Sequence, residues 1–194
     1  MSTHSTVSGR AERRITLNDL TSMSARGERW SMITAYDFMT AGIFEEAGAH
    51  ALLVGDSAAM VVYGYDSTLP VSVDELMPLV RAVVRGSHKP LVIADLPFGS
   101  YQSSISQAME TSVAFMKDGG AQAVKLEGGA PILPQVEALA SAGRASGGTT
   151  WRCGGGACGG WMAAEKVVAI VRTIEPSWEM SSLMSASCTS TCGA

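Results

Sequence analysis

Short, mostly apolar runs alternate with longer amphipathic stretches through the first two thirds of the chain. The runs have the length of β-strands, and the stretches repeat their apolar positions with the period of a helix. The predicted strands cover residues 31–36, 51–54, 90–94 and 123–126, and the predicted helices cover residues 16–26, 38–47, 73–85, 104–117 and 131–142. Apolar strands joined by helices are typical of a parallel sheet covered on both faces, so the pattern predicts an α/β protein.

Two α/β architectures have this pattern, the doubly wound sheet and the (β/α)8 barrel. A doubly wound dinucleotide-binding sheet carries a glycine-rich turn after its first strand, and no such turn follows residues 31–36. Polar residues at several strand ends favour the barrel. A full barrel needs about 200 to 250 residues, whereas four βα units precede Gly143. We therefore expect a member of the (β/α)8 TIM-barrel family, here an incomplete barrel of about four βα units with an irregular C-terminal tail.

Three of the predicted strands end in an acidic residue. The runs LLVGD, LVIAD and AVKLE end at Asp56, Asp95 and Glu127, which are 39 and 32 positions apart. Each separation is about the length of one strand, one helix and two loops, so parallel strands would bring the three carboxylates to the same end of the sheet. Barrel enzymes carry their active sites at that end. Clustered carboxylate oxygens favour a hard cation such as Mg²⁺.

The composition changes abruptly after residue 142. Residues 144–161 read RASGGTTWRCGGGACGGW, in which we expect no strand, and residues 163–174 have the pattern of one helix. The resulting division is a flexible tail at 1–14, a partial TIM-barrel catalytic domain at 15–142, and an aberrant Gly/Cys/Ser-rich tail at 143–194. The change resembles a shift of reading frame more than a second domain.

Overall composition excludes several classes of function. The chain of 194 residues is 46% hydrophobic with a net charge of −4, which fits one globular domain and argues against a nucleic-acid partner. No apolar run approaches the roughly 20 residues that span a bilayer, so we expect no membrane partner and a cytoplasmic location. The cysteines lack the paired spacing of a zinc site, and we expect no role for them. They are Cys153, Cys158, Cys188 and Cys192.

Several long segments resemble the N-terminal half of the ketopantoate hydroxymethyltransferase family. They read TAYDFMTAGIFEEAG, LLVGDSAAMVVYGYDSTLPVSVDEL, ADLPFGSYQ and AVKLEGG, within residues 15–135. The resemblance implies a barrel that transfers a one-carbon unit from 5,10-methylenetetrahydrofolate to 3-methyl-2-oxobutanoate, giving 2-dehydropantoate. It also implies Mg²⁺ dependence and a homo-oligomer, typically a decamer.

The same resemblance implies roles for five residues. Asp56 and Asp95 match metal-ligand positions that also contact the substrate, and Glu127 matches a third acidic position that acts on the metal directly or through water. Ser57 matches a substrate-binding position. Lys125 matches the lysine that pairs with the substrate carboxylate, a role that suits its compact charge.

Each of these residues also has a plainer interpretation. Asp56 and Asp95 could cap turns, and Glu127 could be a solvated loop carboxylate with Lys125 as its neighbour. Lys125 and Glu127 lie two positions apart, however, and therefore point to one face of a strand, which suits a barrel interior. Tyr36, at the end of the first strand, lines the pocket or serves in packing.

The family's later segments have no counterpart here. The resemblance implies a substrate-contacting histidine and a general-base glutamate after residue 142, and neither is found, so we assign no catalytic residue. We expect this chain to have little or no activity. Two alternatives are a Mg²⁺-dependent lyase of the phosphoenolpyruvate mutase/isocitrate lyase type and a non-catalytic chain that associates with a complete subunit.

Overall fold

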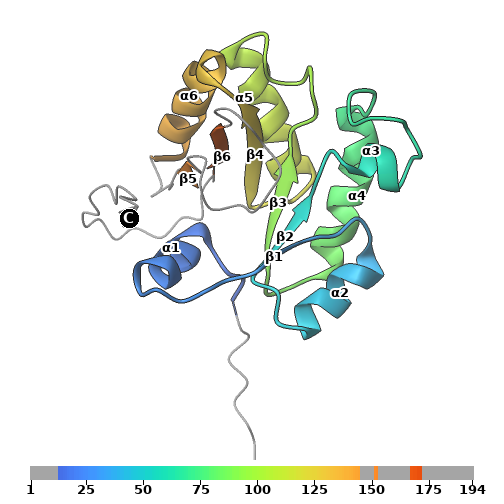
Figure 1. The fold of residues 1–194 in the computed structure, drawn as a ribbon, viewed down its shortest axis with the longest axis vertical. Coiled ribbons are helices and arrows are strands. Elements are labelled where there is room, and N and C mark those ends of the chain that lie inside the picture. Colours follow the sequence, from blue (N-terminus) through green and yellow to red (C-terminus); the bar gives the residue numbers. More distant parts are fainter. Residues whose placement is uncertain (1–12, 145–150, 153–166, 172–194) are drawn as a thin grey trace, which may run out of the picture.

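Four parallel strands form the centre of the structure (Figure 1). They are β1 (Met32–Thr34), β2 (Ala51–Val54), β3 (Leu91–Asp95) and β4 (Ala123–Gly128). The computed structural model describes residues 13–144, 151–152 and 167–171. Every strand predicted from the sequence is found within two residues of its predicted position.

Helices precede and follow the strands. They are α1 (Leu17–Ala25), α2 (Phe38–Glu46), α3 (Ala58–Val61), α4 (Val73–Gly86), α5 (Ile105–Val113), which continues as a π-helical turn (Ala114–Asp118), and α6 (Leu133–Arg144), which follows a 3-10 turn (Ala130–Ile132). Ser72 and Glu75 form a capping box that starts α4, and Asp37 and Ser104 cap α2 and α5. The short helix α3 follows β2, at a point where the sequence pattern predicts neither a helix nor a strand.

The order of the strands identifies the architecture. The sheet runs β1-β2-β3-β4, in chain order, and each of these pairs is parallel. A doubly wound sheet reverses its direction of growth after the first strands, whereas a barrel adds each strand beside the previous one. The fold is therefore that of the (β/α)8 barrel family, with four βα units of an incomplete barrel, as predicted.

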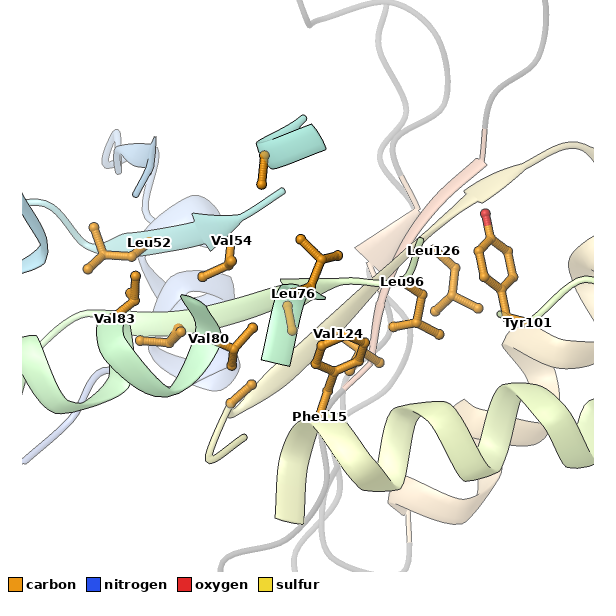
Figure 2. Close-up of a cluster of buried hydrophobic side chains, with 14 of the residues drawn as sticks. Leu52, Val54, Leu76, Val80, Val83, Leu96, Tyr101, Phe115, Val124 and Leu126 are labelled. Atoms are coloured by element: carbon orange, nitrogen blue, oxygen red, sulfur yellow. The ribbon is translucent and has the colours of Figure 1, made fainter. Parts of the chain in front are cut away.

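One face of the sheet packs against α2, α4, α5 and α6. Leu52 and Val54 of β2 and Val124 and Leu126 of β4 alternate with residues of the other face and are fully buried. Figure 2 shows these side chains meeting those of α4 and Phe115. This is the larger core of the structure and corresponds to the helix-covered outer face of a barrel.

The opposite, inner face is closed at the start of the strands by α1. Leu17 and Leu20 of α1 pack against Leu91 and Ile93 of β3 and Ala123 of β4. The burial of Leu17 and of Leu20 contributes about 2 kcal/mol each to the stability of the fold. Figure 1 shows α1 on the side of the sheet away from α2 and α4. The inner face is therefore apolar at its N-terminal end, which leaves the C-terminal end for other side chains.

The described part of the C-terminal tail corrects two predictions. Trp151–Arg152 forms strand β5 and Val167–Val171 forms strand β6, so the expectations of no strand over 144–161 and of a helix over 163–174 are wrong at these residues. β6 pairs antiparallel with β4, and β5 pairs antiparallel with β6. An incomplete barrel leaves the edge of β4 open, and open edges accept further strands. The run VVAIV is β-branched enough to take that place.

Other predictions fall on residues outside the described ranges. These are the tail at 1–12, most of the segment 143–194, and all the cysteines. Within the described ranges, every helix is too short or too polar to span a bilayer.

Candidate functional site

Asp95 and Lys125 form a buried ion pair at the C-terminal ends of β3 and β4. The two residues are direct partners in the parallel register, so their side chains leave the sheet side by side. The Lys125 Nζ donates to Asp95 Oδ2 at 2.6 Å, and their side chains are only 11% and 4% exposed. They continue the inner face below them, because Leu91, Ile93 and Asp95 alternate along β3. The pair thus lies inside the half-barrel.

Glu127 joins this pair from the next inward position of β4. Its Oε1 lies 2.5 Å from the Lys125 Nζ, and its side chain is 39% exposed. The spacing of two positions places both side chains on one face, as the sequence predicts. Lys125 therefore bridges a deeply buried carboxylate and a half-exposed one. We define Asp95, Lys125 and Glu127 as the strand-end cluster.

The protonation of the strand-end cluster follows from its burial. Burial raises the pKa of Asp95 to about 6, and the charges of Asp56 and Glu127 add to this, although Lys125 opposes it. Burial lowers the pKa of Lys125, but the charges of Asp95 and Glu127 outweigh it and raise that pKa overall. Lys125 thus keeps its proton, while Asp95 can titrate in the range where many enzymes work.

Asp56 approaches the strand-end cluster through its main chain. Its backbone N–H points to Asp95 Oδ2 at 3.5 Å, from the turn that follows β2. Gly55 allows this approach, because a Cβ there would lie 2.9 Å from Ser57 Oγ and 3.9 Å from Asp95 Oδ2. The Asp56 side chain is half-buried at the mouth of the half-barrel.

Ser57 and Tyr36 form a second polar contact at the same end. The Tyr36 hydroxyl lies 2.8 Å from Ser57 Oγ, which joins the end of β1 to the turn after β2. Sequence analysis left open whether Tyr36 lines the pocket or serves in packing. Its hydroxyl lies beside Ser57, a predicted site residue, which favours a place in the pocket. The neighbouring Asp37 has a separate role, since its carboxylate caps α2 through the Thr40 N–H at 2.9 Å.

The predicted metal ligands are only partly brought together. Within the described ranges, no group of three or more His, Cys, Asp or Glu side chains is placed to hold a metal ion. The Lys125 ammonium lies between Asp95 and Glu127 and occupies the space that a shared cation would need. Asp56 and Asp95 remain as two oxygen donors from adjacent strand ends. Mg²⁺ is commonly held by one or two carboxylates, with water and substrate completing its shell, so this donor set fits that ion.

Tyr101 is a site residue that the sequence analysis misses. Its hydroxyl donates to the Glu127 carbonyl oxygen at 2.6 Å and accepts the Glu127 N–H at 3.2 Å. The only signal in the sequence is its position in the segment ADLPFGSYQ, six residues after the strand-end Asp95. Nothing in its spacing indicates which strand it contacts.

The matches to known proteins cover the part of the chain that holds the strand-end cluster. The family model described as ketopantoate hydroxymethyltransferase matches residues 14–145. A 3-methyl-2-oxobutanoate hydroxymethyltransferase of Thermobifida fusca is 62% identical over 70% of this chain and 48% of its own length. The enzyme of the same name from Frankia alni is 64% identical over 67% of this chain and 43% of its own. The chain thus spans less than half the length of these curated relatives.

Solved structures give weaker matches. A phosphonopyruvate hydrolase overlaps with 55% of this chain and 37% of its own, at 17% identity and a TM-score of 0.44. A 2,3-dimethylmalate lyase of the PEP mutase/isocitrate lyase superfamily overlaps with 53% and 36%, at 18% identity and a TM-score of 0.41. Overlaps this small do not bear on the chemistry of the chain.

Proposed function

Because the chain belongs to the ketopantoate hydroxymethyltransferase family, we propose that it carries the 2-oxo acid and metal site of that reaction. The reaction transfers a one-carbon unit from 5,10-methylenetetrahydrofolate to 3-methyl-2-oxobutanoate and gives 2-dehydropantoate. The observation that supports this most is the strand-end cluster, which lies inside the half-barrel and within the residues that match the family. In this proposal a small anionic substrate replaces one of the two carboxylates as the partner of Lys125.

Lys125 is the group that binds the carboxylate of the 2-oxo acid in this proposal. Its ammonium remains protonated beside Asp95 and Glu127, so it keeps the positive charge that this exchange of partners requires. Ser57 adds a hydroxyl donor from the turn after β2, and the Tyr36 hydroxyl orients it at 2.8 Å. Together they place the substrate at the C-terminal ends of β2 and β4.

Asp56 and Asp95 would hold Mg²⁺, and Glu127 would reach it through a water molecule. When bound, the ion supplies a Lewis acid for the ketone oxygen of the 2-oxo acid. Asp95 must be ionised to act as a ligand, and burial raises its pKa to about 6, so ion binding is expected to weaken below that pH.

The general base of the reaction is not assigned to any residue of this chain. General-base catalysis contributes about 10²- to 10⁴-fold. We therefore propose that the chain binds the 2-oxo acid but converts it more slowly, by about that factor, than the curated relatives. Turnover near the rate of those relatives would contradict this part of the proposal.

Titration calorimetry of the 194-residue chain with 3-methyl-2-oxobutanoate, with and without Mg²⁺, tests the binding site. We expect Mg²⁺-dependent binding, weakened about tenfold or more in Asp95→Asn and Asp56→Asn. Asp74→Asn is the matched control, because Asp74 is an exposed aspartate in the first turn of α4. Binding that survives chelation of the metal, or that all three variants weaken equally, would refute the site. A folate-independent lyase assay on the same protein tests the alternative, a Mg²⁺-dependent lyase of the phosphoenolpyruvate mutase/isocitrate lyase type.

The family also supports a proposal of self-association and of a cytoplasmic location. The outer surface of α2 is unusually apolar, with Phe38, Met39 and Ile43 exposed by 62%, 71% and 54%. Apolar patches of this kind favour contact with another protein surface. Analytical ultracentrifugation of the chain tests the association, and a monomer at micromolar concentration would contradict it.

A further inference from the structure

Strand β4 extends beyond β3, its parallel partner. The last backbone bond between β3 and β4 runs from the Leu96 N–H to the Lys125 carbonyl oxygen at 3.0 Å. In a strand, main-chain groups two residues apart point to the same side. The N–H and the carbonyl of Glu127 therefore also face β3. The next N–H after Leu96 that could face Glu127 is that of Phe98, but Phe98 lies in the turn that the Ser100 N–H closes on the Pro97 carbonyl oxygen, so the ladder ends here.

After Pro97 the chain turns back, and the turn brings the side chain of Tyr101 to the end of β4 that β3 no longer contacts. The Ser100 N–H and hydroxyl both donate to the Pro97 carbonyl oxygen, at 3.1 and 2.7 Å. Gly99 takes a φ of +87°, which favours glycine at this point of the turn. The turn delivers Tyr101, whose ring is 4% exposed and lies beside Leu96 and Leu126 in Figure 2.

The Tyr101 hydroxyl takes over both hydrogen bonds that β3 no longer makes. It donates to the Glu127 carbonyl oxygen at 2.6 Å and accepts from the Glu127 N–H at 3.2 Å. One hydroxyl can do both, because it carries a proton and two lone pairs. We propose that Tyr101 is a positioning residue for the strand-end cluster: its hydroxyl fixes the main chain of Glu127 and so holds Lys125 and Glu127 against Asp95. The functional part of this inference rests on the proposed function.

Removal of the hydroxyl separates positioning from general stability. Tyr101→Phe keeps the ring and leaves the N–H and carbonyl of Glu127 without their partner. Tyr63→Phe is the matched control, because the Tyr63 hydroxyl also donates to a backbone carbonyl, that of Glu75, at the same distance of 2.6 Å but away from the strand-end cluster. Melting temperatures of both variants report the cost to the fold.

Two measurements decide the proposal. We expect Tyr101→Phe to weaken Mg²⁺-dependent binding of 3-methyl-2-oxobutanoate about tenfold or more, because two hydrogen bonds that hold a site residue are lost, while Tyr63→Phe leaves it unchanged. We also expect the amide hydrogen of Glu127 to exchange about tenfold faster in Tyr101→Phe, with that of Leu96 unchanged.

Equal binding by the two variants and the wild-type chain, or an unchanged exchange rate at Glu127, would overturn the proposal. If the wild-type chain does not bind the 2-oxo acid, the proposed function fails. The exchange rate at Glu127 then still decides whether Tyr101 fixes the end of β4.

Discussion

Charged side chains lie at both ends of the parallel strands, but the groups that they contact differ. At the N-terminal end, Arg14 donates to the carbonyl oxygens of Pro90, at 2.7 Å, and of Ser87, in the loop that leads into β3. Glu45, from the end of α2, accepts the N–H groups of His88 and Lys89 at 2.6 and 3.2 Å. These charges satisfy the main chain of one loop and attach α2 and the segment before α1 to it.

At the C-terminal end the charges contact one another. Asp95, Lys125 and Glu127 are joined through the Lys125 ammonium, and two of the three are almost fully buried. A charge that is bonded to backbone groups stabilises the fold and has little left to offer a ligand. A cluster of side-chain charges can exchange one partner for a substrate or an ion. The difference between the ends thus separates groups that hold the fold from groups that can act on a ligand.

The largest expected effect comes from removing the central charge of the strand-end cluster. Lys125→Met leaves the carboxylate of Asp95 buried without a cation, which costs about 3 to 5 kcal/mol of unfolding free energy at neutral pH. The cost should be smaller near pH 5, because an unpaired Asp95 takes up a proton and becomes neutral. Urea unfolding at the two pH values measures both effects.

The control for this experiment is Lys117→Met, which removes an exposed lysine after α5. It should change the unfolding free energy by less than about 0.5 kcal/mol. If the two lysine variants lost equal stability, the buried pair would have no special role, and the contrast between the two ends would fail.

The pH dependence of stability gives a smaller effect. The pKa of Asp95 in the folded chain, about 6, lies above its ordinary value of 3.8, so between these values the folded chain holds more protons than the unfolded chain. Stability from this group is therefore present below about pH 4 and is lost as the pH rises through 6. Asp95→Asn cannot titrate. From low to neutral pH, the wild-type chain should lose about 3 kcal/mol relative to the variant, and parallel curves in urea unfolding would contradict this.

Much of this fold could be predicted because its signals are local. Strand length, helix period and turn residues placed β1 to β4 within two residues, and the recurrence of Asp56, Asp95 and Glu127 after apolar runs placed carboxylates at one end of the sheet. The helix predicted over 163–174 failed at β6, because a short β-branched run is compatible with both structures. The open edge of β4, a tertiary feature, decides for a strand there.

The site could be predicted less completely than the fold. The alternation of β4 correctly placed Lys125 and Glu127 on one face, but the ammonium between Asp95 and Glu127 depends on side-chain conformations that no pattern encodes. Tyr101 depends on the path of a turn: the Pro-Phe-Gly sequence predicts that the chain reverses, but not which side chain returns to β4. Contacts between strand ends and returning loops are therefore the part that needs coordinates.

The smallest expected effects, from a matched pair of isosteric changes, compare the two ends most directly. Glu45→Gln replaces one accepting oxygen with an amide nitrogen, so either the His88 or the Lys89 N–H loses its partner. We expect a loss of about 1 kcal/mol in unfolding free energy and no change in Mg²⁺ affinity.

Glu127→Gln removes a half-exposed charge and should leave stability nearly unchanged. Mg²⁺ affinity should fall about tenfold, because in the proposed site this carboxylate reaches the ion through a water molecule. Urea unfolding and Mg²⁺ titration calorimetry on both variants give four values. A loss of Mg²⁺ affinity in Glu45→Gln, or a loss of stability alone in Glu127→Gln, would show that the two ends of the strands do not divide folding from binding.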